Sequence, residues 1–163
     1  MNALGTAALM GATLTTAMVA GLLFCFAHLV MPGLGTMDDR GYLTAFQRID
    51  AAIPNPWMML TFLGSPVLTL AALVVHVTGD SPAVPWLGLA LVLVAATVVI
   101  TAAVHLPLNA AVQAAAPQFA DAAGMRDRFE MRWVRWNIAR TVTSVGALAA
   151  LSWALVISGR TGG

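Results

Sequence analysis

The sequence predicts an all-α integral membrane protein: a four-helix transmembrane bundle with a short amphipathic helix between its first and second spans. Hydrophobic residues make up 60% of the 163 residues and charged residues only 9%, whereas a soluble domain carries about 25% charged residues. A helix of about 20 apolar residues crosses a bilayer. Four stretches meet this requirement, at 3–30, 56–77, 84–104 and 138–158. We therefore expect one transmembrane domain over residues 1–163.

The first stretch is expected to be an uncleaved span rather than a signal peptide. No Lys or Arg precedes its apolar run, and the run exceeds the usual hydrophobic length of a signal peptide. Small residues such as Gly11 and Gly21 allow helices to approach closely, which leaves a homo-oligomer possible. We expect this span to end at the Met31-Pro32-Gly33-Leu34-Gly35 cluster of helix breakers.

A short helix is expected next. Thr36 or Asp38 can cap it, and Tyr42, Phe46 and Ile49 recur at helical spacing. Such a helix lies in the membrane interface or packs beneath the bundle. Pro56 then opens the second span, at a first-turn position that tolerates proline.

The remaining spans follow from turn residues and periodicity. Gly79-Asp80-Ser81-Pro82 is a short turn that makes spans two and three antiparallel neighbours. Pro107 is expected to break or kink the chain just after His105. From about Met125 a helical pattern runs without interruption into the fourth span.

The arginines predict the orientation. Both long loops lie on one side of the membrane and carry nearly all of the basic residues, and Arg160 alone lies on the other side. The basic residues of the loop side are Arg40, Arg48, Arg126, Arg128, Arg132 and Arg135. The positive-inside rule therefore predicts cytoplasmic loops, with both termini outside, in a bacterial-type inner or plasma membrane.

Polar residues gather where the fourth span begins. Trp133, Trp136, Asn137 and Arg140 are spaced by three or four and share one helix face. A guanidinium one turn inside an apolar run needs a carboxylate, an anionic ligand, or a path for snorkelling to the interface. Trp136, four residues before Arg140, is positioned to stack on it. The alternative is an ordinary interfacial arginine within an aromatic belt.

Other polar residues are expected at the same membrane depth. They are His28, Asn55, His105 and Asn109, and together they predict an inward-facing pocket between the inner helix ends. No metal ligand is assigned and no cofactor is predicted. Two histidines with a carboxylate such as Asp50 leave iron or copper as an alternative, and His28 with His105 leaves haem as another.

Several classes of function lose their usual support. The chain has no P-loop, no G-x-G-x-x-G, no G-x-S-x-G and no C-x-x-C. Its arginines near 126–135 alternate with Asp127 and Glu130, which is typical of a solvated helix face rather than a nucleic-acid partner surface.

A series of short motifs resembles the anthrone oxygenase family of small four-span membrane proteins. The motifs are Met31-Pro32-Gly33-Leu34, Gln47-Arg48-Ile49-Asp50, Asn55-Pro56-Trp57, Pro107-Leu108-Asn109 and Trp136-Asn137-Ile138-Ala139-Arg140. Relatives often have Asn where this chain has Asp50 and where it has His105. The resemblance implies a membrane oxygenase that converts an anthrone into an anthraquinone with dioxygen, without a recognised nicotinamide or flavin site.

The chemistry of an anthrone, whose methylene is acidic, suggests a hypothesis for the roles of the polar residues. His105 would remove a proton from the acidic methylene, and Arg140, Asn137 and Asn109 would stabilise the resulting oxyanion. The remaining candidates would contact the substrate: Trp133 and Trp136 by stacking on its rings, with Asn55, Gln47, Asp50 and His28 around them.

The expected partners are a lipophilic small molecule, anthrone-like or a quinol, and membrane lipid. The alternative function is that of a non-catalytic membrane accessory or small-molecule-binding protein.

Overall fold

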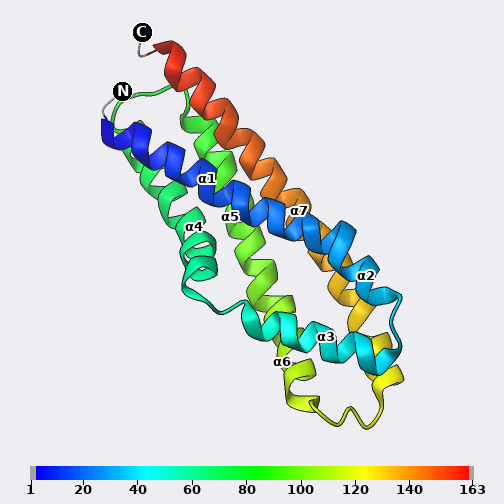
Figure 1. Cartoon of the computed structure of the whole chain (residues 1–163). Helices are drawn as coiled ribbons and strands as arrows, with labels where there is room; N and C mark the ends of the chain where they lie inside the picture. The colour runs from blue at the N-terminus through cyan, green and yellow to red at the C-terminus, as the bar shows by residue number, and fades with distance from the viewer. Residues whose placement is uncertain (1–2, 162–163) are drawn as a thin grey trace.

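The computed structural model describes residues 3–161, and every regular element in this range is helical (Figure 1). Four long helices lie side by side, and a short helix crosses one end of the bundle, here named the α3 end. The four long helices are apolar and long enough to cross a membrane: Ala3–Gly35, Pro56–Val77, Val84–Ala115 and Ala122–Arg160. The predicted fold class is confirmed.

The first and third long helices run further than expected, although each contains a proline. Helix α1 (Ala3–Cys25) continues through a π-helical turn, η1 (Phe26–Val30), into α2 (Met31–Gly35). Helix α5 (Val84–Ile100) likewise continues through η2 (Thr101–His105) into α6 (Leu106–Ala115).

The π-helical turns explain why Pro32 and Pro107 do not end these helices. The Met31 N–H donates to the Phe26 carbonyl and the Leu106 N–H to the Thr101 carbonyl, five residues back. Each wide turn starts a new α-helical segment with the proline in its first turn, where the missing N–H and the ring are tolerated. The third long helix therefore does not break at Pro107, and the first runs through the Met31–Gly35 cluster before ending at its last residue, Gly35.

Helix α3 (Asp39–Ala52) is the predicted amphipathic helix. Asp38 caps it by accepting a hydrogen bond from the Gly41 N–H at 2.8 Å. Its apolar face buries Tyr42, Leu43 and Phe46 against the bundle. Burial raises the pKa of the Tyr42 hydroxyl, which makes no hydrogen bond.

Helix α4 (Pro56–Val77) begins at an Asn55 cap, whose side chain accepts from the Met58 N–H at 3.1 Å. Helix α7 (Ala122–Thr161) runs for 40 residues, about 60 Å at 1.5 Å per residue. This confirms that the helix continues from near Met125 through the fourth span. Because a hydrocarbon core is about 30 Å thick, its first turns stand outside the core.

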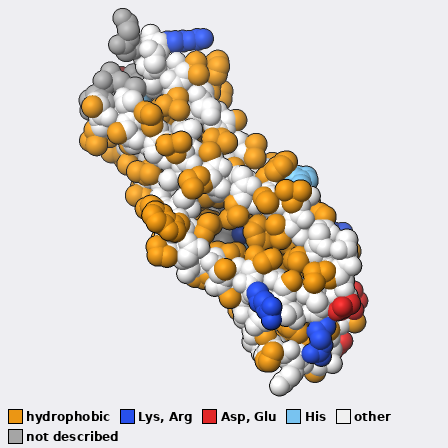
Figure 2. All heavy atoms as spheres, in the orientation of Figure 1, with side chains coloured by type: hydrophobic (Ala, Val, Ile, Leu, Met, Phe, Trp, Pro, Cys, Tyr) orange, Lys and Arg blue, Asp and Glu red, His pale blue; other side chains and the backbone are white. Residues whose placement is uncertain are grey.

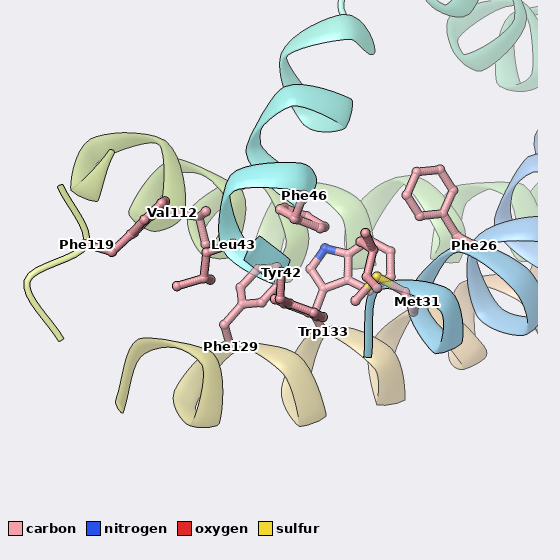
Figure 3. Close-up of a cluster of buried hydrophobic side chains, with 10 residues drawn as sticks. Phe26, Met31, Tyr42, Leu43, Phe46, Val112, Phe119, Phe129 and Trp133 are labelled. Carbon is pink, nitrogen blue, oxygen red and sulfur yellow. The ribbon is translucent and has the colours of Figure 1, made fainter. Parts of the chain in front are cut away.

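Two buried clusters hold the bundle together. At the end away from α3 the core is rich in small residues, among them Ala12, Ala72, Ala90 and Ala154, which allow close helix packing without bulky side chains. At the α3 end the cluster is largely aromatic and contains Phe26, Tyr42, Phe46, Phe129 and Trp133 (Figure 3). Hydrophobic side chains are spread along the whole of the visible face (Figure 2).

Arg126 fastens α3 to α7. Its guanidinium donates to the carbonyls of Gly35 and Met37 and to the carboxylates of Asp39 and Glu130, at 2.7–3.1 Å.

We therefore expect Arg126→Ala to lower the free energy of unfolding by about 2 kcal/mol, because charged hydrogen bonds are lost and two carbonyls lose a donor. Thermal unfolding in detergent measures this loss. Arg128→Ala is the control, because Arg128 is exposed and lies 3.9 Å from its nearest carboxylate, Asp121; equal destabilisation by both variants would contradict the role of Arg126.

Candidate functional site

Arg140 is a buried cation on α7. Only 6% of its surface is exposed. One terminal nitrogen, Nη1, donates to the Thr101 hydroxyl at 3.1 Å, and Nη2 donates to Asn137 Oδ1 at 2.9 Å. The buried Nε has no hydrogen-bond partner, and no ion pair joins Arg140 to a carboxylate within residues 3–161. The guanidinium is thus positioned by neutral groups, and its charge is left uncompensated by the described chain.

Asn137 fixes the position of that guanidinium. The residue is fully buried one turn before Arg140, and its side-chain amide donates to the Leu23 carbonyl of α1 at 3.1 Å. Its oxygen accepts from Arg140. Asn137 therefore connects α1, α7 and the buried charge.

His105 is the second buried group with an unused atom. It lies at the end of η2 and is 1% exposed. Its Nδ1 faces the Ile100 carbonyl at 3.5 Å, and its Nε2 makes no hydrogen bond. A neutral ring with its proton on Nδ1 leaves the Nε2 lone pair free to accept a proton.

Trp133 joins the two groups. The Arg140 guanidinium carbon lies 5.6 Å from the centre of its ring, and the His105 ring meets it edge-on at 5.1 Å between centroids. Phe26, Phe46 and Phe129 also contact Trp133, which is only 3% exposed (Figure 3). The ring is thus part of the packed core and leaves no free face for stacking.

A polar chain continues from Trp133 to α3. The indole N–H donates to Asn109 Oδ1 at 3.0 Å, and the Asn109 amide donates to Asp50 at 2.6 Å. Gln113 donates to the other Asp50 oxygen at 2.8 Å and to the Gln47 carbonyl at 3.1 Å. These hydrogen bonds hold α3 and α6 against the indole. Asn109 and Asp50 therefore fix the position of Trp133, which in turn contacts His105 and Arg140.

The structure brings together six of the ten residues singled out in the sequence through hydrogen bonds and ring contacts: Asp50, His105, Asn109, Trp133, Asn137 and Arg140. Gln47 adds only its backbone carbonyl. Gln113 and Thr101 were missed, although Gln113 follows Asn109 by one helical turn and so shares its face.

Three candidates lie elsewhere. Trp136 is 42% exposed, so the expected stacking of Trp136 on Arg140 is wrong, and the ring that faces the guanidinium is Trp133. His28 is exposed, and its ring packs against Phe24 with 4.3 Å between the ring centroids. Asn55 is the cap of α4.

The proposed metal alternatives gain no support from this geometry. Within the part of the chain that the structure describes, no three His, Cys, Asp or Glu side chains form a metal-ligating group. Asp50 is engaged by Asn109 and Gln113, and exposed His28 is not part of the buried cluster.

The cavity in the structure lies at a different position along the bundle from the pocket that we expected. The aromatic cluster fills the α3 end, where a pocket was expected. The structure instead has a cavity of about 10 Å³ among the membrane-spanning parts of α1, α4, α5 and α7, enough for about one water molecule. Its lining residues are Thr16, Val19, Phe62, Ser65, Val94, Thr97, Val98 and Ser144.

Comparison with known proteins agrees with the motif series in the sequence. The family model described as anthrone oxygenase matches residues 57–150, more than half of the chain. This stretch contains His105, Asn109, Trp133, Asn137 and Arg140. No curated protein and no solved structure matches the chain. The chain belongs to the anthrone oxygenase family.

Proposed function

We propose that this protein is a membrane oxygenase that oxidises a lipophilic aromatic substrate, anthrone-like or a quinol, with dioxygen beside His105 and Arg140. Family membership supports an oxygenase activity. The observation that carries the proposal for the site is the buried Arg140 guanidinium, which has an unpartnered Nε and no carboxylate partner among the described residues. A buried cation of this kind favours an anionic oxygen.

The chemistry fits an anthrone. His105 Nε2 accepts a proton from the methylene carbon, which leaves an anion whose charge lies largely on the ketone oxygen. Arg140 stabilises that oxygen. The electron-rich carbon then transfers electrons to dioxygen and forms a C–O bond, the peroxide takes up a proton, and loss of water leaves the second carbonyl. One anthrone and one dioxygen thus give one anthraquinone and one water.

Asn137 and Asn109 are better assigned to positioning than to oxyanion binding. Asn137 accepts from Arg140 and donates to α1, and Asn109 bridges Trp133 and Asp50. Likewise, the enclosed Trp133 holds His105 and Arg140 rather than stacking on the substrate.

Oxygen uptake tests the function. The protein in lipid nanodiscs is given anthrone while dissolved oxygen and quinone absorbance are followed, with protein-free nanodiscs as the control for spontaneous oxidation. Uptake above that control with one quinone formed per dioxygen supports the proposal. Uptake equal to the control contradicts it, and ligand binding without uptake favours the non-catalytic binding protein.

We also propose that the α3 end lies in the cytoplasm with both termini outside, because the arginines gather in the loops at that end. A C-terminal alkaline phosphatase fusion is then expected to be active and a C-terminal green fluorescent protein fusion dark. The reverse result would invert the orientation.

A further inference from the structure

We propose that the outer face of α7 binds an anionic phospholipid at the α3 end of the bundle, where Arg132 and Arg135 hold the phosphate of the lipid. This inference adds a lipid site outside the buried cluster and does not depend on the oxygenase function.

The two arginines lie on a helix face that continues as a lipid-facing surface. Arg128, Arg132 and Arg135 are spaced by four and three residues, so they share one face of α7. All three are exposed, and Figure 2 shows basic side chains on the surface at this end of the molecule. Further along the same face Val142 and Trp153 are also exposed. One surface of α7 thus passes from apolar residues to basic ones.

The charges of Arg132 and Arg135 are uncompensated. Within the described chain neither arginine forms an ion pair with a carboxylate. The nearest acidic residues along the helix, Asp127 and Glu130, lie on other faces, and Glu130 accepts a hydrogen bond from Arg126. Like charges three or four residues apart on a helix repel each other. An anion held between the two guanidinium groups relieves this repulsion.

The depth of these arginines matches the layer of lipid headgroups. Exposed Trp57 and Trp136 mark the membrane interface at this end, because tryptophan gathers at headgroup level. Arg135 is adjacent to Trp136, and Arg132 lies three residues further out, about 4.5 Å along the axis. The headgroup region is about 5–8 Å thick on each side of the core. Arg128, about 6 Å beyond Arg132, therefore lies past this layer.

A phospholipid with a net negative headgroup fits both parts of this face. Its phosphate accepts hydrogen bonds from guanidinium groups, whose planar fork matches two phosphate oxygens, and its acyl chains lie along the apolar residues that follow. Phosphatidylglycerol keeps the negative charge of its phosphate, whereas choline cancels that charge in phosphatidylcholine. An acidic segment of a protein partner would pair with the arginines but leave the apolar half of the face unused, so these observations favour the lipid.

Lipid retention tests the inference. The protein is placed in nanodiscs that contain equal amounts of phosphatidylglycerol and phosphatidylcholine, and native mass spectrometry counts the lipids of each type that stay bound after release. The wild type is expected to retain phosphatidylglycerol over phosphatidylcholine by at least about tenfold. A basic residue near an anionic membrane surface contributes a factor of about five to binding, so Arg132→Gln and Arg135→Gln are each expected to lower this ratio about fivefold.

Arg128→Gln is the matched control, because it removes the same charge from the same helix face beyond the headgroup layer, and it is expected to keep the wild-type ratio. In detergent without anionic lipid, the Arg132→Gln and Arg135→Gln variants are expected to unfold at the wild-type temperature, because both arginines are exposed; a lower temperature would assign them to the fold instead. Equal retention of the two lipids by the wild type would overturn the inference and favour an acidic protein partner. An equal loss of preference in Arg128→Gln would also overturn it, because a diffuse positive field and not a site would then select the lipid.

Discussion

Arg140→Met is expected to reduce the turnover of anthrone at least about 100-fold, because removing one preorganised group that stabilises an oxyanion costs a factor of about 10²–10³. Its effect on stability is expected to be small or favourable. Methionine removes a buried charge that has no carboxylate partner among the described residues, and replacing buried charges by apolar groups is often neutral or stabilising. The loss of the bonds to Asn137 and Thr101 opposes this gain.

Oxygen uptake and thermal unfolding of the same preparation measure the two effects. Arg135→Met is the control, because Arg135 lies on the same helix but is exposed, and we expect it to retain both turnover and stability. An Arg140→Met protein that unfolds far more easily than the wild type would show that the guanidinium serves the fold. Full turnover by this variant would remove Arg140 from the mechanism.

The second large effect is expected for His105→Asn. General base catalysis contributes about 10²–10⁴-fold to a rate, so turnover should fall by at least about 100-fold. Asn keeps a polar side chain that can donate and accept hydrogen bonds at this buried position, and we therefore expect the variant to fold. Initial rates at saturating anthrone measure the loss.

His76→Asn is the control for His105→Asn, because His76 is a buried histidine that is not the proposed base. His76 is 3% exposed, but its Nδ1 lies 2.7 Å from the Ala72 carbonyl and its Nε2 lies 3.5 Å from Ser158. Turnover is expected to survive this change. If His105→Asn turns over anthrone at the wild-type rate, the base is another group.

Apolarity and charge placement were enough to predict the four helices. A bilayer requires long apolar helices, because every backbone N–H and C=O in hydrocarbon must be hydrogen-bonded within the protein. The ends of the helices were harder to predict. Pro32 and Pro107 have the usual signature of a helix end, and nothing in the local sequence indicates that a π-helical turn precedes each of them.

Part of the site could be predicted from helical spacing. The spacing of Asn137 and Arg140 on one helix predicts their contact, since residues three apart are neighbours. The meeting of His105 with Trp133 depends on how α5 and α7 are rotated about their axes, which one-helix periodicity does not specify. Trp136 was assigned to Arg140 by spacing alone, yet it faces outward.

The turn η2 has a consequence for the evolution of this chain. A π-helical turn is equivalent to one residue inserted into a regular α-helix, so the residues after it are rotated by about 100° relative to an uninterrupted helix. Deleting a single residue from Thr101–His105 would restore regular geometry and turn Asn109 and Gln113 away from Asp50. The number of residues in this segment is therefore fixed by the rotation that α6 needs relative to α5.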